Sequence, residues 1–384
     1  MHPMVKPALR RAWRERQTVQ FGVAPAHAVS LGPVDTVTGS FLQLLDGTRG
    51  MPLLREEARA MGLPEDRVDA LVERLTEAGL LDDTASGGPG VKALARRPCA
   101  VDRLRADAAS LSLVHPEPGG GMRRLAARRA MRIQVRGAGR VGATAAALLS
   151  GAGVGHVEVV DGGSAAPWDV APGGLPEGAV GQRRDAAARG LVRRSAPLRP
   201  PRSTARGGTG AVAGGEPALD LVLVCPRDGL AAYAPDPATS AGWVSTGVPH
   251  LYAGVIEATG AVGPLVVPGE TPCAGCLELE RVESDPGWPR LLAQWRSGGR
   301  RTPVPACDLA LSAVVAGLAV AHALSFLDGG SPLSKGARWE TSLPRLGWRS
   351  QQFVPHVDCV CEASGKSEGR DASGFGPAHE TMAG

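Results

Sequence analysis

Aromatic residues and lysines are scarce in this sequence. Its 384 residues include only 7 Trp, 5 Phe and 2 Tyr, whereas Gly and Pro number 52 and 32. The core must therefore be built largely from Ala, Val and Leu, with close backbone approaches and many turns. A catalytic lysine has few candidates, because only four of the 42 basic residues are lysines: Lys6, Lys92, Lys335 and Lys366.

Three further absences narrow the class of protein. A net charge of +4 is too small to indicate a nucleic-acid partner. Seven cysteines over this length are too sparse for a disulfide scaffold, and an odd number cannot all pair within one chain. The N-terminus, MHPMVKPALRRAWRER, lacks the apolar core of a signal peptide, so we expect a cytoplasmic protein. A hydrophobic content of 43% excludes a wholly disordered chain.

The first 83 residues are predicted to form a small domain. Two apolar runs within residues 18–31 predict a hairpin, and three short helical patterns follow, over residues 37–47, 51–62 and 64–81. A hairpin with three helices is typical of a winged-helix-like module. Further along the chain, composition predicts a linker at 84–130 and a disordered tail at 362–384.

The pattern changes at Met131 to a strand, a glycine turn, an Ala-rich helix and a second strand. Such a β-α-β unit implies a parallel sheet with helices on its faces, and further strands are expected at 219–226 and 250–267. We therefore predict an α/β, Rossmann-like domain with a mostly parallel sheet over residues 131–361. The apolar segment 308–327 is long enough to cross a bilayer, but its small residues favour a helix buried against the sheet.

The glycine turn has the spacing of a nucleotide cradle. Gly137 allows a tight turn, Gly139 lets the backbone approach a phosphate, and Gly142 permits close packing of the helix on the strand. Asp161, 19 positions beyond Gly142, ends the next strand and suits a ribose hydroxyl. The alternative is that these glycines serve only the turn.

Four cysteines form two close pairs, Cys273 with Cys276 and Cys359 with Cys361. In a reduced protein they predict one structural Zn²⁺ site, although the single-residue spacer of the second pair is less usual. The alternative is four reduced thiols. Cys225 and Cys307 could serve as nucleophiles, but burial is the favoured interpretation.

From these motifs the chain resembles the ThiF/MoeB-type, ubiquitin-activating-enzyme-like adenylyltransferases over residues 131–361. The resemblance rests on VRGAGRVG…VEVVD, DLVLVC, GPLVVPGETPCAGCLELER and the late cysteine pair. It implies ATP and Mg²⁺, adenylation of the carboxylate of a peptide or small carrier protein, and a homodimer.

The chain departs from the family pattern at the positions that the resemblance assigns to phosphate and metal. Gly163 replaces a second acid, and Pro172-Gly173 fall where an Arg-Gln pair is expected. Arg184 is the counterpart of a phosphate-binding lysine. Arg227 falls near the position of the family's magnesium-binding aspartate, and Asp228 follows one residue later. A cation in place of a carboxylate ligand would oppose metal binding.

A winged-helix-like module before a ThiF-like domain resembles the precursor-recognition proteins of thiazole/oxazole-modified peptide pathways. The resemblance implies that the module binds a leader peptide as an added strand and that the partner enzyme is of the YcaO type. A DNA-binding winged helix is disfavoured by the mixed charges of residues 51–83.

Two functions remain open. The first is an ATP-dependent adenylyltransferase, with ATP on Gly137–Gly142, Asp161 on the ribose, Arg184 on the phosphates and Asp228 on magnesium. The second is a catalytically degenerate scaffold that presents a leader peptide to another enzyme. A nicotinamide-dependent oxidoreductase would lack its catalytic His or Tyr-Lys pair. The arginine run 183–206 is interpreted as a solvated helix face rather than a ligand site.

Overall fold

The computed structural model describes residues 1–198, 218–297, 304–361 and 363. Within them the chain forms two compact units. One contains Met1–Arg132 and Ala147–Val157, and the other contains Ile133–Ala146, Glu158–Arg189 and most of the C-terminal half. The expected tail at 362–384 lies, apart from residue 363, outside the described residues.

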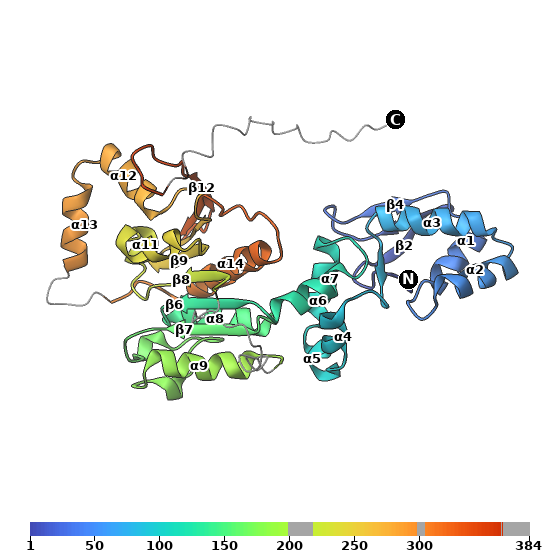
Figure 1. Cartoon of the computed structure of the whole chain (residues 1–384), viewed down its shortest axis with the longest axis horizontal. Helices are drawn as coiled ribbons and strands as arrows, with labels where there is room; N and C mark the ends of the chain where they lie inside the picture. The colour runs from blue at the N-terminus through green and yellow to red at the C-terminus, as the bar shows by residue number, and fades with distance from the viewer. Residues whose placement is uncertain (199–217, 298–303, 362, 364–384) are drawn as a thin grey trace, which may run out of the picture. The chain divides into compact units, whose positions relative to one another are not determined.

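The N-terminal unit begins with two small antiparallel sheets and three helices (Figure 1). One sheet has the order β2-β3-β4, in which the expected hairpin is β3 with β4. The other pairs β1 with β5. Their bounds are β1 Pro3–Val5, β2 Arg11–Glu15, β3 Thr18–Phe21, β4 Val29–Leu31, β5 Leu81–Asp83, α1 Thr36–Leu44, α2 Met51–Ala60 and α3 Glu65–Glu77.

Local sequence explains these three helices. The Asp35 carboxylate accepts a hydrogen bond from the Thr38 amide and so caps α1. Pro52 lies in the first turn of α2, where its missing N–H costs nothing. Their apolar faces meet the sheet in a core that includes Phe21, Phe41, Leu54, Leu75 and Leu81.

The stretch expected to be a linker, 84–130, instead forms four short helices. These are α4 Pro89–Ala95, α5 Pro98–Arg103, α6 Arg105–Val114 and α7 Gly120–Arg128. Leu94, Leu104, Leu111 and Leu125 are buried together, and this spaced leucine set is the signal that the Arg/Ala-rich composition obscured. Buried Lys6 donates from Nζ to the Ser112 and Pro116 carbonyls, at 2.6 and 3.0 Å, and thus ties the N-terminus to these helices.

Strands from residues 132–352 form a seven-stranded sheet of order β12-β11-β10-β9-β8-β6-β7. β6 pairs in parallel with β8, and β8 with β9, while β10, β11 and β12 extend the sheet as antiparallel strands. The predicted α/β class is confirmed. The strands are β6 Arg132–Arg136, β7 His156–Val160, β8 Leu221–Val224, β9 His250–Ile256, β10 Thr259–Val266, β11 Ala337–Ser342 and β12 Arg349–Gln352.

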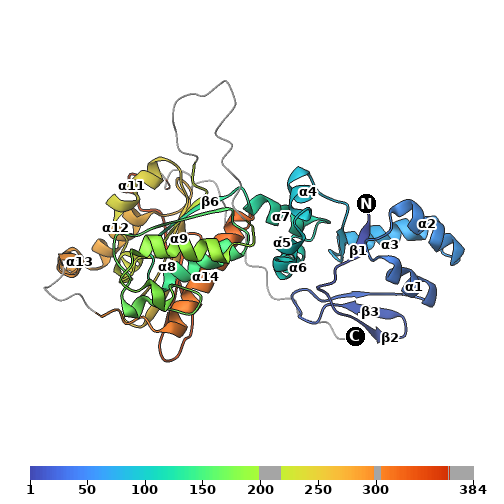
Figure 2. The same cartoon turned by 90° about the horizontal axis from the view of Figure 1, so that it is seen from below.

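Helices cover both faces of this sheet (Figure 2). A Cβ atom on Gly254 of β9 would meet Ala232 of α10, whereas one on Gly260 of β10 would meet Val315 of α14. Gly260 pairs with Val255, and side chains alternate between faces, so α10 and α14 lie on opposite faces. The helices are α8 Arg140–Gly151, α9 Arg184–Ser195, α10 Leu230–Tyr233, α11 Pro237–Ser245, α12 Ala274–Ser284, α13 Trp288–Ser297 and α14 Leu309–Leu327; η1 Pro167–Asp169 and η2 Glu177–Ala179 are 3₁₀ turns.

Among the described residues, α14 alone is long and apolar enough to cross a membrane. It packs against β8, β9 and β10, and its buried side includes Leu311, Val315, Ala319 and Ala323. The Asp308 carboxylate caps its first turn by accepting from the Ala310 and Leu311 amides. The interpretation as a helix packed on the sheet therefore agrees with the structure.

The glycine turn joins β6 to α8. Gly137 has φ of +103°, and a Cβ on it would lie 1.9 Å from the Cys225 carbonyl oxygen at the end of β8. A Cβ on Gly142 would lie 2.1 Å from the Gly137 carbonyl oxygen. Backbone contacts within the fold thus require glycine at both positions, whether or not a ligand binds.

A substitution at this turn should destabilise the protein strongly. We expect Gly137→Ala to lower the free energy of unfolding by about 3 kcal/mol or more, because both its φ and its contact with Cys225 are incompatible with a side chain. Gly178→Ala is the matched control, since a Cβ there meets nothing within 4 Å. Urea unfolding of the two variants tests this, and equal stability would contradict it.

Candidate functional site

The predicted site residues Gly137, Gly139, Gly142, Asp161 and Arg184 surround the glycine turn in the second unit. Asp161 follows β7, and its Oδ2 accepts a hydrogen bond from the Ala138 amide at 2.8 Å. Its Oδ1 accepts from the Gly163 amide at 2.9 Å. The acidic residue thus holds the turn directly, and one acceptor site on Oδ2 remains for another donor.

Arg184, the first residue of α9, binds Asp161. Its Nε and Nη2 lie 2.9 and 2.8 Å from Asp161 Oδ1, and its Nη1 donates to the Ser164 carbonyl at 2.6 Å. A Cβ on Gly163 would lie only 2.3 Å from Arg184 Nη2. The absence of a side chain at position 163 therefore makes room for this guanidinium.

A second acid continues the network. Asp169 is 2% exposed, and its Oδ1 accepts from Arg227 Nε at 2.7 Å. Its Oδ2 lies 3.9 Å from Arg184 Nη1. We call Asp161, Arg184, Asp169 and Arg227 the ion-pair chain. Two carboxylates alternate with two guanidiniums in it, so its net charge is zero.

Arg227 also lies over the glycine turn. A Cβ on Gly139 would be 3.2 Å from Arg227 Cγ, and the Arg227 guanidinium carbon lies 5.6 Å from the centre of the exposed Trp168 ring. The Asp228 carboxylate accepts from the Leu230 amide at the start of α10. It takes no part in the ion-pair chain.

The ion-pair chain controls the ionisation of Asp161. Burial alone would raise the pKa of this carboxyl, but hydrogen bonds from Arg184 and from the Gly163 and Ala138 amides outweigh burial and lower it. Sequence reasoning identified Asp161 and Arg184 but missed their pairing and the role of Asp169. The only signal of this network in the sequence was Arg227, a basic residue near the position expected for a metal ligand.

The four predicted metal ligands also lie together. The sulfur atoms of Cys273, Cys276, Cys359 and Cys361 are all within 4.8 Å of one another, with 3.5 Å separating Cys273 from Cys359 and also Cys276 from Cys361. A tetrahedral zinc with bonds of about 2.3 Å would place its sulfurs roughly 3.8 Å apart. The donor set and its spacing therefore fit zinc.

The other cysteines of interest are poorly placed for nucleophilic chemistry. Burial raises the pKa of the Cys225 thiol to about 12 and that of the Cys307 thiol to about 11. Both are therefore protonated at neutral pH, whereas the thiolate is the nucleophile. Cys225 is buried as expected, whereas Cys307 is partly exposed.

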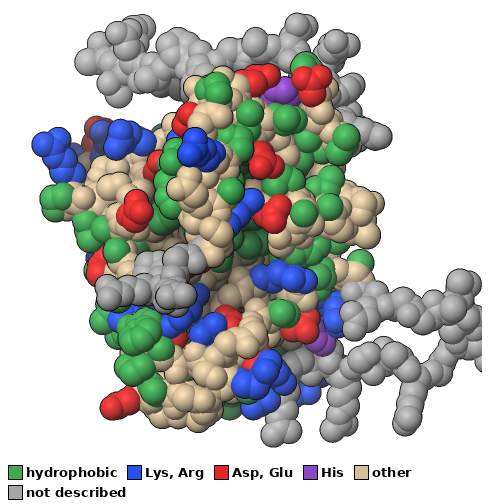
Figure 3. Space-filling view, turned by 90° about the vertical axis from the view of Figure 1, so that its left-hand side faces the viewer, with side chains coloured by type: hydrophobic (Ala, Val, Ile, Leu, Met, Phe, Trp, Pro, Cys, Tyr) green, Lys and Arg blue, Asp and Glu red, His purple; other side chains and the backbone are tan. Residues whose placement is uncertain are grey.

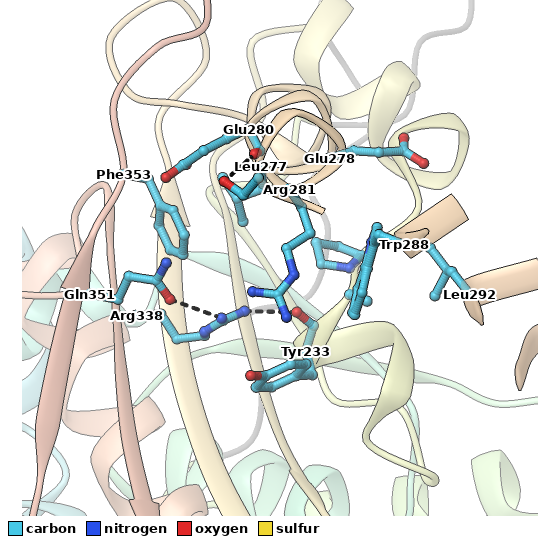
Figure 4. Close-up of a pocket in the computed structure, with 13 residues that line it drawn as sticks. Tyr233, Leu277, Glu278, Glu280, Arg281, Trp288, Leu292, Arg338, Gln351 and Phe353 are labelled. Carbon is cyan, nitrogen blue, oxygen red and sulfur yellow. Dashed lines mark hydrogen bonds between the residues drawn. The ribbon is translucent and has the colours of Figure 1, made fainter. Parts of the chain in front are cut away.

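A separate pocket of about 80 Å³ lies between α12, α13 and strands β11 and β12 (Figure 4). Arg338 crosses its base, donating to the Tyr233 carbonyl at 2.7 Å and to Gln351 Oε1 at 3.2 Å. Arg281 lies over the Trp288 ring, 4.5 Å from its centre. The volume suits a single side chain rather than a nucleotide. No sequence motif could have indicated this pocket, because its lining comes from four distant segments.

The lowered pKa of Asp161 predicts a pH dependence of stability. A carboxyl whose pKa is lower in the folded state contributes stability above its unfolded value, near 4, and loses it as the pH falls through the folded pKa. Between pH 5 and pH 3, the melting temperature of the wild type should therefore fall more steeply than that of Asp161→Asn. Glu177→Gln, at an exposed acid, should keep the wild-type slope. Parallel curves for all three proteins would contradict the prediction.

Comparison with known proteins agrees with this architecture. No curated protein matches the chain. E. coli MccB solved with ATP is 15% identical with a TM-score of 0.64, covering 94% of this chain and 99% of MccB. PaaA is 15% identical with a TM-score of 0.65, covering 91% of this chain and 99% of PaaA. At these identities the likeness establishes a shared fold. The profile of the ThiF family matches residues 114–363. Since that match spans well over half of the sequence, the chain belongs to the ThiF family.

Proposed function

We propose that this protein binds a precursor peptide with its N-terminal unit and presents it to a partner enzyme, its ThiF site no longer adenylating. The observation that carries the proposal is Arg227. It falls near the position where the family resemblance expects a magnesium-binding carboxylate, one residue before Asp228, and it is bound to Asp169 at 2.7 Å.

Adenylation of a carboxylate requires a divalent cation and cationic groups on the phosphates. The two acids beside the glycine turn, Asp161 and Asp169, are already neutralised by Arg184 and Arg227. A metal ion would have to displace a guanidinium from a largely buried carboxylate. Pro172-Gly173, in place of the expected Arg-Gln, adds no cation to offset this.

The peptide-binding part of the proposal draws on the N-terminal sheets. The β2-β3-β4 sheet has two edge strands, and an extended peptide can add to such an edge through main-chain hydrogen bonds. The fold is shared with MccB, which has been solved in complex with N-formylated MccA.

A YcaO-type partner enzyme and a homodimer follow from the family resemblance. The cytoplasmic location is supported by seven cysteines that are all free.

The alternative is an active adenylyltransferase. It is supported by the intact glycine turn, by Asp161 at the end of β7 and by the fold shared with MccB, which has been solved with ATP. ATP would then lie on Gly137–Gly142 with its ribose at Asp161. Arg184 would assist the phosphates, and Asp228 would have to leave the start of α10 to hold Mg²⁺.

The distribution of charged side chains on the surface of the second unit does not indicate a nucleic-acid partner. The side of the second unit that faces the viewer in Figure 3 mixes basic, acidic and apolar side chains, and no basic patch extends across it. A nucleic-acid surface would concentrate Lys and Arg on one face.

ATP–pyrophosphate exchange distinguishes the two functions. We expect no exchange and no ATP binding by calorimetry, with or without Mg²⁺ and a candidate precursor peptide, while the peptide itself binds. Exchange that is lost in Asp161→Ala but retained in Glu177→Ala, at an exposed acid, would overturn the scaffold proposal and establish adenylation.

We also propose that Cys273, Cys276, Cys359 and Cys361 hold a structural zinc ion, which would tie the segment after β12 to the start of α12. Metal analysis should find about one zinc per chain. Cys273→Ser/Cys276→Ser should lose the metal and melt at a lower temperature, because the zinc stabilises only the folded chain. Cys99→Ser, at an exposed cysteine outside the cluster, should keep both properties. A stably folded, metal-free wild type would refute this site.

A further inference from the structure

We propose that the free edge of β2, with the groove beside it, binds an extended peptide segment rich in Asp or Glu. The proposal rests on the proposed function, since it names the edge that captures the peptide and the chemistry of the captured segment. It arises from the groove, the exposed Trp13 and an uncompensated set of arginines.

The groove lies between the β2-β3 hairpin and α1 and encloses about 440 Å³. Val19 and Val34 give it an apolar lining, and Arg11, Trp13 and Arg16 line it from the hairpin side. All five residues of β2 are exposed, and β2 is an edge of its sheet (Figure 2). A strand edge beside a partly apolar groove suits a peptide that alternates its side chains between groove and solvent.

Trp13 is the natural anchor. Its side chain is 55% exposed, and its ring lies over Gly39 of α1, where a Cβ would be 3.2 Å from the indole Cζ2. Glycine at this position lets the indole approach the helix backbone closely. Exposed tryptophans in concave sites are typical centres of binding energy.

Among the described residues, no carboxylate forms an ion pair with the arginines of this edge, and Arg14 contacts only the neutral Gln20 side chain, at 3.5 Å. The segment 10–16 carries four arginines and one glutamate, and none of the four, Arg10, Arg11, Arg14 and Arg16, forms an ion pair with a described residue. Asp35, the one acid lining the groove, accepts from the Thr38 amide as the α1 cap, and this bond holds its pKa below the usual range. An acidic ligand would therefore meet uncompensated guanidiniums.

The opposite edge of the sheet does not offer this chemistry. β4 has only three residues, and the carbonyl of the following Gly32 already accepts from Arg74 at 2.9 Å. Helix α3 carries five carboxylates and two arginines, which repel an acidic ligand. The same negative helix disfavours a nucleic-acid duplex, because a winged helix uses its third helix together with the hairpin.

The test uses the full chain and fluorescein-labelled twelve-residue peptides in which Glu alternates with Val or Thr. Matched peptides carry Gln or Lys in place of Glu. By fluorescence anisotropy at 0.15 M salt, the Glu peptide should bind at least 10-fold more tightly than the Gln peptide. Its affinity should weaken as salt rises.

Two substitutions locate the site. Arg11→Glu/Arg16→Glu should weaken binding of the Glu peptide at least 10-fold and improve binding of the Lys peptide, and Trp13→Ala should weaken both. Arg96→Glu/Arg97→Glu makes the same charge change at exposed arginines outside the groove and should leave affinity unchanged. If the reversed protein does not fold by circular dichroism, Arg11→Gln/Arg16→Gln should still weaken binding severalfold.

Three outcomes would overturn the proposal. If Arg11→Glu/Arg16→Glu and Arg96→Glu/Arg97→Glu lose affinity for the Glu peptide equally, only the net charge of the protein matters. A duplex DNA that outcompetes the Glu peptide at the same salt would assign the arginines to nucleic acid. A precursor peptide that binds the wild type and the Arg11/Arg16 variants equally would move the site elsewhere while leaving the proposed function intact. If no peptide binds at all, the proposed function fails as well.

Discussion

The ion-pair chain of Asp161, Arg184, Asp169 and Arg227 is the constraint on which the site depends. The side chains of Asp169 and Asp161 are 3% and 6% exposed, so a charge on either carboxylate is costly without a partner. In a metal-dependent enzyme a divalent cation would supply part of that compensation. Here two guanidiniums supply it.

This constraint links departures from the family pattern that look independent in the sequence. Gly163 lacks the expected carboxylate, and the space that it leaves is where Arg184 reaches Asp161. Arg227 falls near the position of a second expected carboxylate and binds Asp169. The loss of expected carboxylates at 163 and 227 and the gain of a guanidinium at 227 thus belong to a single rearrangement of charge around the turn. The glycines persist through it because backbone contacts require them at Gly137 and Gly142.

Much of this could be predicted from sequence, and the limits have physical causes. Local signals located the hairpin, the first three helices, the β-α-β unit and the four cysteines, since each depends on neighbouring residues. The four helices in 84–130 were missed because the leucines buried together are widely spaced in a segment otherwise rich in Arg and Ala. The bond from Arg227 to Asp169 joins residues 58 positions apart, and no local pattern reports it.

The same charge balance determines whether substitutions at single positions could create a magnesium site beside the glycine turn. A carboxylate placed at position 227 alone would face Asp169 and Asp161 after the loss of the Arg227 guanidinium, and mutual repulsion would raise their pKa values rather than create a metal site. A carboxylate at 163 alone would collide with Arg184. A magnesium site at this position therefore requires coordinated changes at 163, 184 and 227, since a single change either collides with Arg184 or leaves buried carboxylates without a cation. The energetic barrier therefore lies in the intermediates that carry only one of these changes.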